Sequence, residues 1–175
     1  IVKIAVQVGR SGKLTPVALL TPVDVGGVRV SRATLHNEDY VKEKDLRAGD
    51  RISLIRAGDV IPQVQRRIKK GNGSSFHMPT KCPSCKHRVI KEGAQHFCIN
   101  ASCPAQRKGR IVHASKVLDI EGLGEAVSGE LVEKDLVEDL ADLFRLTIKD
   151  LMNISHFQEK SARKLYQSIQ RAKKP

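Results

Sequence analysis

Four cysteines form the group of residues whose types and spacing point most directly to chemistry. The set consists of Cys82, Cys85, Cys98 and Cys103. The first pair lies on the tight turn Cys-Pro-Ser-Cys, twelve residues follow, and four residues separate the second pair. Four soft thiolates within tetrahedral reach are the ligands of a closed structural Zn²⁺ site, which leaves no open position for a catalytic water. Because His87 and His96 lie between the pairs, a site of three cysteines and one histidine is an alternative, and unrelated thiols or disulfides are another.

A second candidate site is the glycine-rich sequence Gly122-Leu-Gly124. In helix-hairpin-helix elements such a turn aims backbone N–H groups at a phosphate oxygen, and the next helix's N-terminus adds to the attraction. Glycine suits the turn because it permits unusual dihedral angles and a close approach to the sugar-phosphate chain. An ordinary turn between two helices has the same pattern, but the apolar Ile120 and Leu123, a similar sequence 34 residues further on and the basic charge of the chain together favour the DNA-binding interpretation.

Two arginines are placed in turns between predicted strands. Arg10 lies in Val8-Gly-Arg-Ser-Gly12, and Arg56 lies in Ile55-Arg-Ala-Gly-Asp59. At the end of a strand a guanidinium can form two hydrogen bonds with a phosphate. The alternative is that each arginine is simply solvated, as is the basic C-terminal sequence Arg171-Ala-Lys-Lys174.

The sequence predicts no catalytic residue. It contains no Lys-x-Asp-Gly nucleotidyl-attachment motif, no P-loop and no Gly-x-Gly-x-x-Gly dinucleotide motif. The spacing of serine, histidine and aspartate does not suggest a catalytic triad. His36 is interpreted as a structural histidine in a polar loop.

Strands must position the two arginine turns. Alternation of apolar and polar residues from Val2 to Val8 is typical of a half-buried strand. Further strands are expected over residues 16–21, 25–30, 50–56 and 59–68, with a helical or irregular insert over 31–41 and a Gly-centred hairpin turn at 57–59. Five short strands predict a small barrel, with an OB-fold as the natural candidate and an SH3-like barrel as the alternative.

The rest of the chain divides into two further modules, giving a multidomain α+β protein. The sequence Lys70-Gly-Asn-Gly-Ser-Ser75 indicates a flexible joint after the barrel. We therefore expect an OB-fold over 1–70, a linker and a four-cysteine zinc finger over 71–104, and an all-α segment over 105–175. The helical segment repeats weakly: Asp119–Glu125 resembles Asn153–Glu159, which lies 34 residues further on. Two copies of helix, turn and helix predict two helix-hairpin-helix units.

Composition favours a polyanionic partner. The formal net charge is +12 and the isoelectric point is about 9.8, and cationic side chains that neutralise phosphates release condensed counterions. Aromatic residues make up 3% of the chain, which favours binding of a duplex backbone over stacking on single strands. No signal peptide or apolar run of transmembrane length is visible, so we expect a cytoplasmic protein, and we also expect it to be a monomer.

Several of these motifs together resemble the bacterial NAD-dependent DNA ligases. The OB domain of that family is resembled by residues Gln7–Ala18, Gly27–Glu38 and Arg56–Gln63. The cysteine spacing followed by Cys103-Pro-Ala-Gln106 resembles the four-cysteine finger of these ligases. Asp119–Gly124 and Glu159–Ala162 resemble their helix-hairpin-helix domain. The resemblance covers essentially the whole chain in the family's order.

The resemblance implies a clamp around nicked duplex DNA, acting in replication and repair. It places Arg10 and Arg56 against DNA near the nick, with Val60 and Ile61 packing against it and Gly122 and Gly124 on phosphates further along. The zinc is structural, whereas NAD and Mg²⁺ serve the full enzyme and are not bound mainly by this segment. The nucleotidyltransferase domain that carries the catalytic lysine would precede Ile1, so the segment alone is expected to be inactive in adenylylation.

Two departures from the family pattern are visible. The segment from His113 to Ile120 is shorter, which predicts a shortened helix before the first hairpin. The second hairpin has Ser155-His-Phe-Gln158 where the family has glycines, so its phosphate contact is in question. Other classes remain open: a stand-alone zinc-dependent adaptor that binds nucleic acid without catalysis, and an RNA-binding OB–zinc protein of translation.

Overall fold

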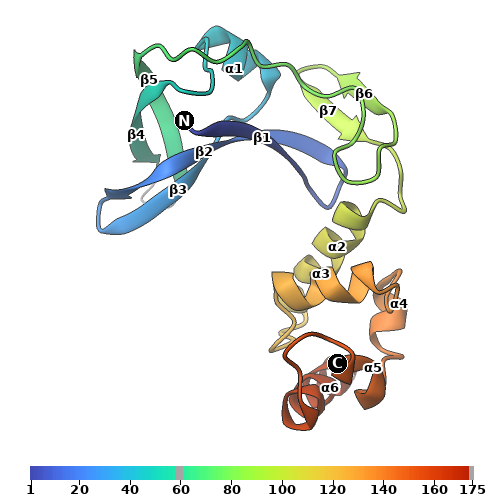
Figure 1. The fold of residues 1–175 in the computed structure, drawn as a ribbon. Coiled ribbons are helices and arrows are strands. Elements are labelled where there is room, and N and C mark those ends of the chain that lie inside the picture. Colours follow the sequence, from blue (N-terminus) through green and yellow to red (C-terminus); the bar gives the residue numbers. More distant parts are fainter. Residues whose placement is uncertain (58–60, 174–175) are drawn as a thin grey trace. The chain divides into compact units, whose positions relative to one another are not determined.

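The computed structural model describes residues 1–57 and 61–173 (Figure 1). The chain divides into two compact units, Ile1–Ile99 and Asn100–Pro175. Among the described residues, the first unit holds a mixed sheet and one helix, and the regular elements of the second are all helices, so the predicted α+β class is confirmed. None of the helices in the described ranges combines the length and apolar composition that a membrane crossing requires.

The first unit contains seven strands and a short helix. In chain order these are β1 (Lys3–Val8), β2 (Lys13–Val25), β3 (Val28–Thr34), α1 (Glu38–Glu43), β4 (Arg51–Ala57), β5 (Ile61–Lys69), β6 (Val89–Glu92) and β7 (Gln95–Cys98). Strand β1 confirms the first strand, which was predicted from the alternation of apolar and polar residues. The sheet has the order β4-β5-β3-β2-β7-β6, and β1 pairs with the other edge of β2. The described part of residues 1–70 holds the five strands that were predicted there, β1 to β5, and β6 and β7 from the following segment extend the same sheet.

The longest strand, β2, differs most from the predicted boundaries. It runs unbroken for 13 residues, so the predicted end of the strand over 16–21 and the predicted start of the strand over 25–30 were wrong. The turn lies instead at Gly26 and Gly27, which both have positive φ. In the first half of β2, every second side chain is buried, whereas residues 21–24 are exposed. The first half therefore supplies the buried side chains of β2, and Val23–Val25 of the second half pair with Val28–Val30 of β3.

Helix α1 begins later than the predicted insert at 31–41. Strand β3 continues to Thr34, and the helix starts at Glu38 because the Asn37 side chain accepts the Tyr40 N–H at 2.8 Å. The exposed His36 packs edge-on against the ring of Tyr40 at a centroid distance of 4.9 Å.

The joint predicted at residues 70–75 is packed against the barrel. The carboxylate of Asp50, which is 1% exposed, accepts the Gly71 N–H at 2.7 Å, and Gly73 N–H donates to the Ala48 carbonyl at 3.1 Å. A Cβ on Gly71 would lie 2.2 Å from the carbonyl carbon of Gly49. Glycine is therefore used here for close backbone approach, and the expectation of a flexible joint was wrong.

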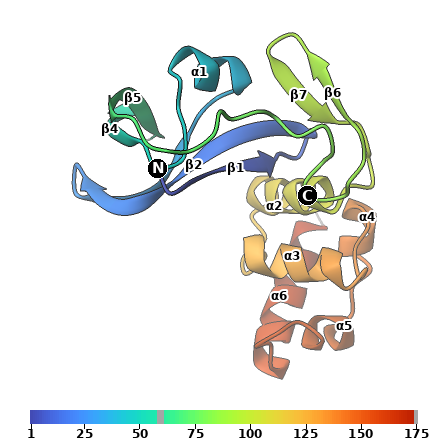
Figure 2. The same ribbon diagram turned by 45° about the horizontal axis from the view of Figure 1, so that its top comes forward.

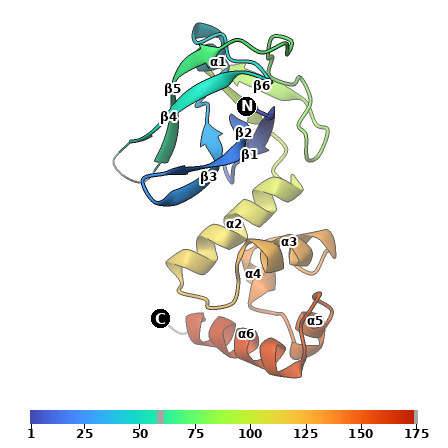
Figure 3. The same ribbon diagram turned by 60° about the vertical axis from the view of Figure 1, so that its left-hand side comes forward.

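The second unit confirms the predicted helical segment. It consists of α2 (Pro104–Val117), α3 (Glu125–Glu133), α4 (Leu140–Leu143), α5 (Ile148–Met152) and α6 (Glu159–Ala172) (Figure 3). Buried residues from these helices and their connections form one core, including Ile111, Leu131, Leu151, Leu165 and Ile169. Capping boxes at Asp139 and Thr147 satisfy the first amides of the short helices α4 and α5.

Candidate metal centre and nucleic-acid interface

The four cysteines come together from three local structures. Cys82 and Cys85 lie on a turn in which Lys86 N–H donates to the Cys82 carbonyl at 2.9 Å and Cys82 N–H donates to the His87 carbonyl at 2.8 Å. Cys98 ends β7, and Cys103 precedes α2 as its N-cap residue.

The sulfur atoms form a cluster suited to a metal ion. All four Sγ atoms lie within 4.8 Å of one another, and three of the four residues are buried. The Sγ atoms of Cys85 and Cys98 are 3.5 Å apart, too far for the bond of about 2 Å that joins sulfurs in a disulfide. The four cysteines are therefore positioned to bind a metal, which agrees with the prediction from their spacing.

The two histidines between the cysteine pairs lie outside this cluster. Within the described ranges, the metal-competent group consists of the cysteines alone. His96 Nε2 lies 3.8 Å from Glu38 Oε2, and His87 is exposed.

Burial affects the protonation of the cluster. It raises the pKa of the Cys82 thiol, although the amides of Cys85 and Ser84 that donate toward its sulfur oppose the effect. A bound cation favours the thiolate instead, so metal binding and loss of thiol protons are coupled. Buried soft sulfur donors fit a Zn²⁺ ion, which would have a structural role here because four protein ligands complete its tetrahedron.

The turn that carries Arg10 connects β1 and β2. Gly9 N–H donates to the Lys13 carbonyl at 2.8 Å, and Gly12 has φ 82°. Arg10 itself is exposed, and no ion pair to it is found in the described ranges. Its guanidinium is therefore available to an external anion.

The second predicted arginine turn can be followed only in part. Strands β4 and β5 pair in antiparallel fashion up to Ala57 opposite Ile61. Val60, together with the predicted turn residues at 58–59, lies outside the described residues, as do the side chains of Arg56 and Ile61.

The two predicted hairpins share a residue with positive φ at the centre of the turn, although Asp119 has φ 52° and the equivalent Asn153 has φ −75°. Each joins two helices, α2 to α3 and α5 to α6, and Gly122 and His156 occupy equivalent positions with φ 84° and 64°. The apolar side chains of Ile120 and Leu123 are buried in the core of the unit, and Ile154 is buried at the equivalent place in the second hairpin.

The hairpins differ in the amide that precedes the second helix. Gln158 N–H donates to Ser161 Oγ at 2.9 Å. At the equivalent position, Gly124 N–H meets no acceptor within the described ranges, since the residue three further on is Val127. Sequence reasoning missed Ser161, although the serine three residues after Gln158 is a visible capping signal.

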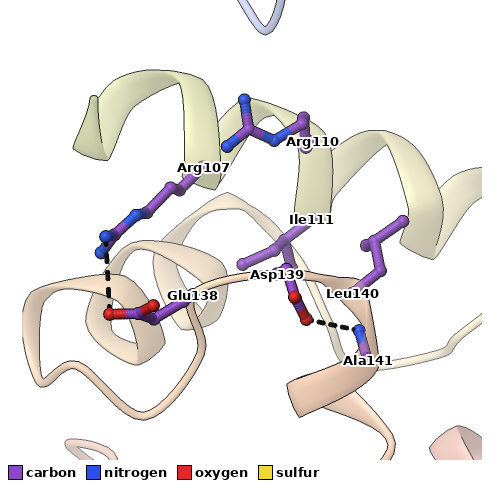
Figure 4. Close-up of a pocket in the computed structure, with 7 residues that line it drawn as sticks. All are labelled: Arg107, Arg110, Ile111, Glu138, Asp139, Leu140 and Ala141. Atoms are coloured by element: carbon purple, nitrogen blue, oxygen red, sulfur yellow. Dashed lines mark hydrogen bonds and ion pairs between the residues drawn. The ribbon is translucent and has the colours of Figure 1, made fainter. Parts of the chain in front are cut away.

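Figure 4 shows a pocket in the second unit whose charged side chains contact one another or the backbone. Its volume is about 390 Å³, and it is lined by Arg107, Arg110, Ile111, Glu138, Asp139, Leu140 and Ala141. Its acidic side chains have structural partners: Glu138 Oε1 lies 3.6 Å from Arg107, and Asp139 accepts the Ala141 N–H at 2.8 Å.

Comparison with known proteins shows which proteins this chain is similar to. Residues 1–75 match the family described as the NAD-dependent DNA ligase OB-fold domain. The chain is 47% identical over 180 residues to the DNA ligase of Desulfosudis oleivorans, covering 99% of this chain and 26% of the relative. It is 48% identical over 177 residues to the DNA ligase of Rubrobacter xylanophilus, covering 97% and 26%, respectively.

The first unit thus contains an OB-fold of the DNA ligase type. The chain belongs to the bacterial NAD-dependent DNA ligase family, as its motifs predicted, and it spans about a quarter of the length of these relatives.

Proposed function

We propose that this chain is the DNA-binding clamp portion of an NAD-dependent DNA ligase that seals nicks in duplex DNA during replication and repair. The observation that carries the proposal is the similarity to DNA ligases over 99% of the chain. The net charge of +12 supports a polyanionic partner. NAD and Mg²⁺ would serve the nucleotidyltransferase domain of the same enzyme, which is the proposed partner in the chain.

The proposed division of labour follows three segments. A five-stranded OB barrel over 1–70 contacts the duplex near the nick, a zinc finger over 71–104 follows it, and a segment of two helix-hairpin-helix units over 105–175 reaches phosphates further along. The cysteine cluster supports Zn²⁺ as the metal, and the match over residues 1–75 supports the OB-fold.

In the barrel, Arg10 and Arg56 are proposed to contact the backbone of the duplex, and Val60 and Ile61 are proposed to pack against the DNA beside them. The exposure of Arg10 at the β1–β2 turn supports this role. A guanidinium in such a place binds phosphate through charge-assisted hydrogen bonds that carry no base identity.

Replacing either arginine by alanine is expected to weaken duplex binding about tenfold, which corresponds to about 1.4 kcal/mol. The loss should be the same for duplexes of different sequence, and the slope of log K against log salt should fall by about one. Binding of nicked duplex by the 175-residue chain, followed by fluorescence anisotropy at several salt concentrations, measures both quantities.

The matched control is Arg171→Ala, because Arg171 lies in the last turn of α6 and was interpreted as solvated. If both Arg10→Ala and Arg56→Ala bind as the unmodified chain does, and both seal nicks at the unmodified rate when placed in the whole ligase, the assignment is wrong.

The two hairpins are proposed to contribute unequally to DNA binding. The Gly124 amide has no acceptor among the residues that the structure describes, and no atom lies within 4 Å of the place where a Cβ would be, which leaves room for a phosphate oxygen at the start of α3. In the second hairpin, Ser161 already occupies the equivalent amide, and Phe157 packs against the core. The first hairpin therefore binds phosphate, whereas the second mainly packs.

Gly124→Val is expected to lower duplex affinity about tenfold with little loss of stability, since no atom lies within 4 Å of the added Cβ and φ is −84°. Gly122→Val should lower affinity as well, but with backbone strain at φ 84°. Phe157→Ala should chiefly lower the free energy of unfolding, by about 2 kcal/mol for a half-buried ring. Anisotropy and thermal unfolding of each variant separate the two effects.

Gly129→Ala is the control on the same helix, where the atoms nearest to the new Cβ belong to the flexible Lys108 side chain, at 3.7 Å. It should leave affinity unchanged. If substitutions at His156 and Gln158 lower duplex affinity and substitutions at Gly122 and Gly124 do not, the roles assigned to the two hairpins would be reversed.

The chain alone is expected not to form a covalent adenylate. No lysine lies in a Lys-x-Asp-Gly motif, which is the nucleotidyl-attachment signature. Incubation with NAD and Mg²⁺ followed by intact-mass measurement should show the unmodified mass, while a full-length relative treated in parallel gains AMP. Detection of AMP bound covalently to this chain would show that the assignment of adenylylation to another domain is wrong.

A further inference from the structure

The hairpin that carries Cys98 is joined directly to the turn that carries Arg10. Strand β7 pairs antiparallel with the first residues of β2, with Phe97 opposite Lys13 and His96 opposite Leu14 (Figure 2). Beyond this pairing, Cys98 N–H donates to the Gly12 carbonyl at 2.8 Å. One of the four candidate metal ligands is therefore hydrogen-bonded, through its own backbone, to the β1–β2 turn.

The turn has little freedom once this connection is made. Gly12 is buried and its N–H donates to the Gly9 carbonyl at 2.9 Å, while Gly9 N–H donates to the Lys13 carbonyl. Leu14 is 1% exposed and anchors the start of β2. Arg10 lies between these bonded glycines, so its position depends on the strand that β7 pairs with.

A second contact holds β7 to the same unit. His96 Nε2 lies 3.8 Å from Glu38 Oε2, and Glu38 Oε1 accepts the Met78 N–H at 3.0 Å. Glu38 is 7% exposed, so this contact is largely shielded from water. The metal-bearing hairpin is thus attached to the sheet through its backbone and to α1 through a side chain.

We propose that metal bound by the four cysteines positions the Arg10 turn for the duplex backbone. Cys98, with Phe97 and His96 beside it, acts as the positioning segment. When the metal leaves, β7 loses one of the contacts that fix it, the bond from Cys98 N–H to the Gly12 carbonyl is weakened, and the position of Arg10 becomes less restricted. The DNA part of this inference rests on the proposed function, whereas the structural part does not.

Amide hydrogen exchange of the 175-residue chain, with and without Zn²⁺, tests the structural part. Removing the metal with a chelator is expected to speed exchange at Gly9 and Gly12 at least tenfold. Amides of the β4–β5 pair, which does not contact β7, should change less than twofold and so report that the barrel remains folded. Equal exchange at Gly9 and Gly12 in both forms overturns the proposal.

If removal of the metal unfolds the whole of the first unit, replacing Zn²⁺ by Cd²⁺ tests the proposal in a chain that stays folded. Cd²⁺ is also held by four thiolates, but its larger radius lengthens the metal–sulfur bonds. Amide chemical shifts at Arg10 and Gly12 are expected to change more than those at Gly26 and Gly27, which form the turn at the other end of β2. Equal changes at the two turns overturn the proposal.

Duplex binding tests whether the positioning matters for Arg10. Arg10→Ala is expected to cost about tenfold in affinity with metal bound and less than twofold without it. Arg66 is an exposed arginine on β5, and Arg66→Ala should change duplex affinity by the same factor with and without the metal. A loss for Arg10→Ala that does not depend on the metal overturns the positioning role alone. Failure of the chain to bind duplex at all overturns the proposed function and leaves the exchange result intact.

Discussion

Loss of the metal is expected to unfold residues 80–104, the largest effect predicted for this chain. The segment has two four-residue strands, and few of its side chains are buried apart from Cys82, Cys98 and Cys103. Such a small segment cannot bury enough apolar surface to offset its conformational entropy, so metal binding and folding are coupled. Structural zinc in small fingers binds with an apparent free energy of about 10–16 kcal/mol at neutral pH, which is lost when the ligands are disrupted.

Elemental analysis of reduced, carefully purified protein should find one zinc per chain. Cys85→Ser should abolish this stoichiometry and cause loss of amide protection across the segment. Ser84→Ala is the matched control, because the side chain is exposed and the backbone amide that donates toward Cys82 remains. Purified protein without zinc, yet with a protected segment, would contradict the prediction.

The cysteine cluster could be predicted from the sequence because its information is local. Two pairs of thiols at ligand spacing restrict the chemistry without knowledge of the fold, and the sulfur positions agree with that prediction. The strand β1 and the helical segment were also predictable, since apolar periodicity directly reflects which side chains are buried.

The boundary of β2 could not be predicted because Pro22 and Asp24 suggest a break where the strand continues. Pairing with β3 shifts register between Leu19 and Val23, so Pro22 lies at an irregularity where a missing N–H is tolerated. The side chains of residues 21–24 are exposed, and the alternation used to recognise strands is absent there.

The connection between the finger and the barrel was hidden for a different reason. Strands β6 and β7 are short and partly polar, and β7 pairs with a strand more than eighty residues earlier in the chain. The buried Glu38 likewise meets Met78 and His96 only after folding. Contacts of this range depend on topology, which local patterns of residues do not specify.

The glycines after β5 show how composition can mislead. A sequence rich in glycine and serine predicts a flexible linker, because these residues restrict the backbone least. In the structure, the Cβ of a residue at position 73 would lie 2.4 Å from the Ala48 carbonyl oxygen, and that of a residue at 71 would lie 2.6 Å from the Asp50 nitrogen. Glycine is required there because two backbone segments touch.

Gly71→Ala is therefore expected to destabilise the first unit strongly, by about 3 kcal/mol or more, since the new methyl group meets backbone atoms that cannot move aside like a flexible side chain. The displacement would also break the bond from Gly71 N–H to the buried Asp50 carboxylate. Denaturant unfolding of the 175-residue chain measures the loss. Gly27→Ala is the control: its φ of 77° strains an alanine by about 1–2 kcal/mol, but no atom lies within 4 Å of the new Cβ. If residues 71–73 did not pack against the barrel, Gly71→Ala would be neutral or slightly stabilising. Gly71→Ala would then lower stability less than Gly27→Ala does, and that result would refute the close packing of residues 71–73 against 48–50.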